Sequence, residues 1–118
     1  MARPLGIVLT VVALLAASVP VESQTSAKTY RIGLLGAFSP TSPEGAHLWG
    51  AFLRELRDLG YAEGQNLVVE GRFYGNRLER LPALASELVR ARVDVILAGA
   101  APAPEAAKHA TSTIPIVM

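Results

Sequence analysis

Residues 30–36 read YRIGLLG, a short apolar segment that ends on a glycine. A second segment of the same kind, VDVIL, occupies residues 93–97 and is followed closely by Gly99. Short apolar runs bounded by glycine are typical of buried β-strands. We therefore expect these two segments to form the central strands of one sheet.

The segments between the apolar runs are amphipathic and predict helices. Ser42 is a good N-cap candidate with Pro43 at the first helical position, and Gly60 is placed to end that helix from a C′ position. A second helix is expected to begin close to Leu81, because Pro82 is tolerated only in the first turn of a helix.

Two further strands and a third helix complete the pattern. Residues 67–74, LVVEGRFY, alternate only partly, with Glu70 and Arg72 on one face, which suits an edge strand with one wet face. An alanine-rich helix is expected over residues 104–111, and residues 114–118 begin a fourth strand. The order predicts the α/β class: a doubly wound parallel sheet with right-handed crossovers, strand order 2-1-3-4 and helices on both faces.

The amino-terminal segment has the layout of a secretory signal peptide. Arg3 precedes the mainly apolar residues 5–19, and polar residues follow. We expect residues 1–23 to be cleaved and residues 28–118 to work in the periplasm. An uncleaved membrane anchor is the alternative, but the apolar run is shorter than the roughly 20 residues that a span requires.

Composition excludes several classes of function. The chain has 118 residues, 51% of them hydrophobic, and a formal net charge of +1, which gives no reason to expect a nucleic-acid partner. Because cysteine is absent, disulfides, thiolate metal sites and lipid attachment through a lipobox cysteine are excluded. His47 and His109 lie too far apart for a common zinc motif, so we expect neither a metal nor a cofactor.

Enzymatic and nucleotide-binding readings find little support in the motifs. Gly33 and Gly36 lack the third glycine and the spacing of a dinucleotide fingerprint, and no GxxxxGK[ST] segment occurs. A GxSxG elbow is absent, and the two histidines suggest no Ser-His-acid set, so an exported hydrolase is a minor alternative.

Several segments in the same order resemble one family, the ABC transporter substrate-binding proteins of the type I periplasmic binding protein fold, related to tryptophan- and tyrosine-type binding proteins. The resemblance is carried by RIGLL at 31–35, FLRELRDLGY at 52–61, EGQNL at 63–67, RLPALASELV at 80–89, VDVI at 93–96 and TIPIV at 113–117.

The resemblance implies a non-enzymatic protein of two lobes that traps a small organic solute, for example one with a carboxylate, and delivers it to ABC permease subunits. Because nothing covers the fourth strand, we expect residues 28–118 to be a partial amino-terminal lobe. A membrane-anchored sensory ligand-binding domain shares this fold and differs only if the leader is retained.

Ligands of doubly wound sheets bind beyond the carboxyl ends of the strands, at the switch point between the first and third strands. Phe38 could stack on a solute or instead pack on a neighbouring loop, Ser39 could donate a hydrogen bond, and the helix start near residue 104 could attract a carboxylate. The resembling proteins usually have a hydroxyl residue after the third strand, where this chain has alanine. The candidate ligand-binding residues are Ala37, Phe38, Ser39, Tyr74, Gly99, Ala100 and Ala101, with Tyr74 the weakest because packing suits it better.

Overall fold

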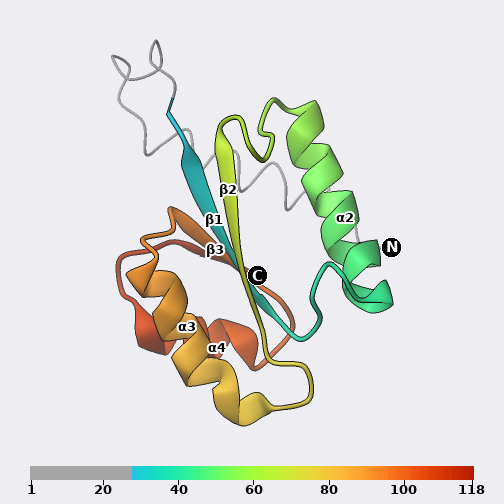
Figure 1. Ribbon diagram of the computed structural model, residues 1–118. Helices are drawn as coiled ribbons and strands as arrows, with labels where there is room; N and C mark the ends of the chain where they lie inside the picture. The colour runs from blue at the N-terminus through green and yellow to red at the C-terminus, as the bar shows by residue number, and fades with distance from the viewer. Residues whose placement is uncertain (1–27) are drawn as a thin grey trace.

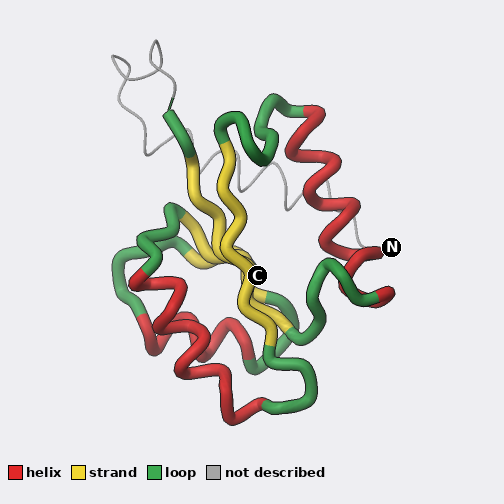
Figure 2. Tube along the Cα trace, in the orientation of Figure 1, coloured by secondary structure: helices red, strands yellow, loops and turns green. Residues whose placement is uncertain are grey.

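The computed structural model describes residues 28–118, so the predicted signal peptide, residues 1–23, lies outside the described residues. Four parallel strands form one sheet in the order β2-β1-β3-β4, which confirms the α/β class and the predicted strand order. Helices lie on both sides of the sheet (Figure 1, Figure 2). The elements are β1 (Tyr30–Gly36), α2 (Pro43–Asp58), β2 (Leu67–Phe73), η2 (Leu78–Arg80), α3 (Leu81–Arg90), β3 (Val95–Ala98), α4 (Ala103–Ala110) and β4 (Ile116–Val117).

The third and fourth strands begin later than the sequence pattern predicts. Two hydrogen bonds join Asp94 to Arg31. The Asp94 backbone N–H donates to Arg31 O at 2.7 Å, and the Asp94 carboxylate accepts from the Arg31 backbone N–H at 2.8 Å. The regular β3 ladder starts directly after this residue, at Val95. Pro115 has no N–H to give to a ladder, and β4 begins only after it.

The core consists of two apolar layers, one on each face of the sheet. On one face, α2 contributes Trp49, Phe52 and Leu56, which pack against strand residues such as Ile32 and Leu34. On the other face, α3 and α4 pack against the sheet. That second cluster comprises Leu35, Leu81, Leu84, Ala85, Leu88, Val93, Ile96, Ala98, Ala103 and Ala107.

Both predicted ends of α2 are confirmed. The Ser42 side chain accepts a hydrogen bond from the Gly45 N–H at 3.0 Å, which satisfies one of the free donors of the first turn. Gly60 follows the helix with φ +100°, a backbone conformation that glycine adopts without steric cost. These two residues set where α2 starts and stops against the sheet.

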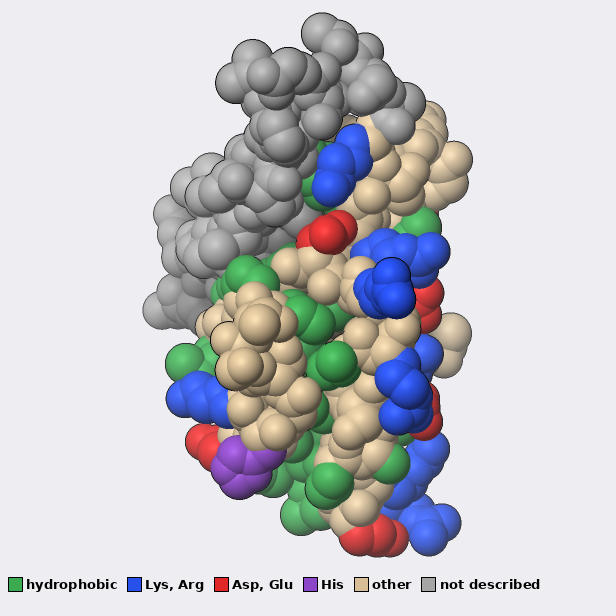
Figure 3. All heavy atoms as spheres, turned by 90° about the vertical axis from the view of Figure 1, so that its left-hand side faces the viewer, with side chains coloured by type: hydrophobic (Ala, Val, Ile, Leu, Met, Phe, Trp, Pro, Cys, Tyr) green, Lys and Arg blue, Asp and Glu red, His purple; other side chains and the backbone are tan. Residues whose placement is uncertain are grey.

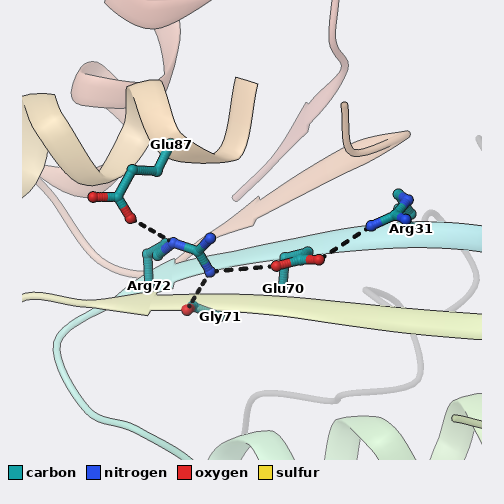
Figure 4. A network of polar contacts seen from close by, with 5 residues as sticks. All are labelled: Arg31, Glu70, Gly71, Arg72 and Glu87. Carbon is teal, nitrogen blue, oxygen red and sulfur yellow. Dashed lines mark hydrogen bonds and ion pairs between the residues drawn. The ribbon is translucent and has the colours of Figure 1, made fainter. Parts of the chain in front are cut away.

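The edge strand β2 carries a polar network on the face that it shares with α3 (Figure 4). Arg72 bonds Glu87 of α3 at 2.7 Å and also contacts Glu70, which in turn bonds Arg31 of β1 at 3.1 Å. Partly exposed pairs of this kind contribute about 1 kcal/mol or less each. Their charges also discourage pairing of another strand with this open edge.

The side of the molecule with α3 and α4 has a mixed charge. Lys and Arg side chains gather along one side of this face, with Asp and Glu side chains among them and hydrophobic side chains between (Figure 3).

No helix within residues 28–118 combines the length and the apolar character that crossing a bilayer requires.

Candidate ligand-binding site

The loops that follow the first three strands meet at the carboxyl edge of the sheet. The Gly99 N–H donates to Leu35 O at 2.8 Å, and the Tyr74 N–H donates to Gly36 O at 3.0 Å. The Gly75 N–H donates to Ala37 O at 2.9 Å. These bonds tie all three loops to the end of β1, so the structure brings the predicted site residues to one edge.

The loop after β1 is fixed by the first turns of α2. The indole N–H of Trp49 donates to Phe38 O at 2.8 Å, and the Ser42 hydroxyl donates to Ser39 O at 2.7 Å. Gly45 lies so close to this loop that a Cβ at its position would overlap Ser39 O. With its backbone held in this way, Phe38 presents a side chain that is 49% exposed.

The other polar or aromatic candidates are already engaged in part. The Ser39 hydroxyl pairs with the Thr41 hydroxyl at 2.8 Å and accepts from the Thr41 N–H at 3.0 Å, so a solute would share it with the loop. Tyr74 is half-buried and packs against the apolar layer beneath α3. Phe38 is therefore the candidate side chain most available to a solute.

The segment from Gly99 into α4 offers mainly backbone groups. Ala100 and Ala101 are exposed, and the peptide bond between Ala101 and Pro102 is cis. At the start of α4, the Ala103 N–H already donates to Ala100 O at 3.2 Å and Pro104 has no N–H. Glu105 adds a negative charge to the same turn. This helix start therefore has less to give a carboxylate than the sequence suggested.

A large apolar hollow opens beside these loops, and the predicted site residues Gly99, Ala100 and Ala101 line part of it. It has a volume of about 650 Å³ and lies between α2, β3 and the start of α4. Trp49 and Phe52 belong to the core of the protein and also form part of the wall of this hollow. The hollow is lined by His47, Leu48, Trp49, Ala51, Phe52, Leu97, Ala98, Gly99, Ala100, Ala101, Pro104, Glu105 and Met118.

Two groups in residues 28–118 have a resolved change in pKa, and neither is a candidate site residue. Burial raises the pKa of the Tyr30 hydroxyl, helped by Tyr61 and Asp94, at the amino end of β1. Hydrogen bonds from its own backbone and from Arg77 lower the pKa of Glu79. The same residues contain no group of three or more His, Asp or Glu side chains suited to a metal ion. The candidate residues present the exposed Phe38 ring, the Ser39 hydroxyl and backbone groups.

Comparison with known proteins yields one family and one relative. The chain matches the family described as ABC transporter substrate binding protein over residues 45–118. A tyrosine-binding protein of Clostridioides difficile is 34% identical over 67 residues, which are 57% of this chain and 19% of the relative. The matched stretch of this chain therefore spans only about a fifth of the length of that protein. No solved structure matches the chain significantly.

Proposed function

Because this chain belongs to the family of ABC transporter substrate binding proteins, we propose that it supplies one wall of an extracytoplasmic solute site. The protein then serves an ABC importer: it holds a small organic solute and passes it to permease subunits in the membrane. Residues 1–23 act as a cleaved signal peptide in this proposal, and the working compartment is the periplasm. The carboxyl edge of the sheet faces the solute.

The observation that carries this proposal is the junction of the loops after β1 and β3. The Gly99 N–H donates to Leu35 O and the Trp49 indole N–H donates to Phe38 O, which supports a site made by the exposed ring of Phe38 and the backbone of Gly99–Ala101. This is the switch point of the sheet, where doubly wound folds bind ligands. The proposed role is binding without catalysis, as membership of a substrate binding protein family suggests.

The solute is proposed to have a flat or apolar part that stacks on Phe38. Aromatic contacts of this kind contribute about 0.5–1.5 kcal/mol beyond the area that they bury. A carboxylate on the solute would be met by the backbone N–H groups of Ala100 and Ala101, because those of Gly99 and Ala103 already donate to Leu35 O and Ala100 O. The relative described as a tyrosine-binding protein supports a solute that combines both features.

A calorimetric titration of the mature two-lobed protein with L-tyrosine and a panel of other small carboxylates tests this function. We expect saturable heat with at least one solute and no product. Phe38→Ala should weaken binding by about tenfold, since a loss of 1.4 kcal/mol corresponds to that factor. Leu59→Ala is the matched control, because Leu59 is similarly exposed (43%) at the other end of α2 and should leave the affinity unchanged.

Three results would contradict the proposal: chemical turnover of a solute, equal affinity in Phe38→Ala, or no binding across the panel. The chain that ends at Met118 should bind weakly or not at all, because one lobe supplies only part of the enclosing surface. Micromolar binding by that chain alone would show that the second lobe is not needed.

A further inference from the structure

In the described part of the chain, the wall of the apolar hollow contains one carboxylate, that of Glu105. Glu105 lies in the first turn of α4 and is exposed. It lines the hollow together with Gly99, Ala100 and Ala101, the backbone segment of the proposed solute site. Among the lining residues that the structure describes, none is Lys or Arg, and His47 of α2 is the one other with an ionisable side chain. Glu105 therefore gives this wall a negative charge.

This carboxylate has no cationic partner among the described residues. Glu79 of η2 bonds Arg77 at 3.1 Å, and Glu87 of α3 bonds Arg72 at 2.7 Å. Glu105 takes part in none of the ion pairs that the described residues form with one another. A carboxylate beside an apolar wall attracts a cation more strongly than one surrounded by water, because less solvent screens the pair. Glu105 is thus placed to bind a cation that comes from outside the chain.

A glutamate in the first turn of a helix often has a purely structural role. In a capping box, its carboxylate accepts a hydrogen bond from the backbone N–H of the N-cap residue. The N-cap of α4 is Pro102, which has no N–H to donate, so this arrangement cannot form. The remaining structural role of Glu105 is a favourable charge at the helix N-terminus, and that role is independent of which solute is bound. The two roles can therefore be separated by solute selectivity.

We infer that Glu105 accepts a hydrogen bond from a protonated amino group of the solute and selects solutes with an amine over their amine-free counterparts. The inference rests on the proposed function, in which the N–H groups of Ala100 and Ala101 meet the carboxylate of the solute. A carboxylate acceptor beside these two donors provides a partner for each end of a zwitterion. A solute with a carboxylate and no amine is disfavoured, because its charge has the same sign as that of Glu105.

Calorimetry of the mature two-lobed protein with matched pairs of solutes tests this role. L-tyrosine is compared with 3-(4-hydroxyphenyl)propionate, which keeps the ring and the carboxylate but lacks the amine. Any other solute that binds is compared with its own amine-free counterpart. The native protein should bind the solute with the amine about tenfold or more tightly than its counterpart. Glu105→Gln should weaken binding of the amine-bearing solute by about tenfold and leave the amine-free solute bound as before or more tightly.

Glu44→Gln is the matched control, because Glu44 is exposed in the first turn of α2, carries the same charge and is not among the residues that line the hollow. It should leave the ratio of the two affinities unchanged. Equal binding of the paired solutes by the native protein would overturn the inference, and so would an equal loss for both solutes in Glu105→Gln. Binding of an amine-free solute that depends on Phe38 would end the inference but keep the proposed function, whereas no binding across the panel would end both.

Discussion

Trp49→Ala is expected to lower the free energy of unfolding by about 3–5 kcal/mol, the usual cost of deleting a large buried aromatic side chain. Trp49 is 4% exposed and lies in the apolar layer between α2 and the sheet, with its ring 6.2 Å from that of Phe73. The substitution leaves a cavity beside the apolar hollow and removes the indole N–H that donates to Phe38 O. Urea denaturation followed by circular dichroism measures the loss.

Trp49→Phe is the informative partner of this substitution. It keeps an aromatic ring against Phe73 but leaves Phe38 O without its N–H donor, so the expected cost is smaller, about 1–3 kcal/mol. Trp49→Phe should nevertheless weaken solute binding, because the Phe38 loop loses the hydrogen bond that holds its carbonyl against α2. If Trp49→Phe bound the solute as tightly as the native protein, the indole hydrogen bond would have no part in holding the site.

Gly45→Ala is expected to destabilise the domain by about 1–3 kcal/mol, since overpacking against a fixed neighbour forces the backbone to move. A Cβ at Gly45 would overlap the carbonyl of Ser39, which also accepts hydrogen bonds from the Ser42 backbone and hydroxyl. The obstacle is backbone, so no rotamer change relieves it. The loop with Phe38 must shift, and solute affinity should fall together with stability.

Gly50→Ala provides the control within the same helix. A Cβ at Gly50 would come no closer than 3.6 Å to the Arg54 guanidinium, an ordinary contact. Replacing glycine in a helix interior usually stabilises by about 0.5–1 kcal/mol, so this variant should gain stability and keep its affinity. If both alanine variants behaved alike in urea and in calorimetry, the close approach of α2 to the loop would not be a constraint.

The order and type of the elements could be predicted because their signals are local. The apolar runs around Leu34 and Ile96, the cap at Ser42 and the stop at Gly60 are each contained in a few neighbouring residues. Some limits moved by one or two residues: β3 starts at Val95, β4 starts after Pro115, and α4 runs over Ala103–Ala110. A parallel sheet then places the candidate loops at one edge, whatever their side chains are.

The features that position the site could not be predicted, because each depends on contacts between residues of different elements. Trp49 has the spacing of a core residue, and nothing in that spacing shows that its indole reaches Phe38 O. Gly45 lies in a predicted helix, and its close approach to Ser39 O depends on where the loop after β1 lies. The same holds for the ion pair between Arg72 and Glu87 and for the apolar hollow beside α2, since both depend on how the elements pack.

The central claim is that a solute is bound at the carboxyl edge of this sheet. A crystal structure of the full-length protein with its solute tests it most directly. We expect the solute to contact the Phe38 ring and the backbone of residues 99–101, with the second lobe closing over it. A solute that touches neither loop, for example one held at the opposite edge near Tyr30 and Tyr61, would contradict the claim.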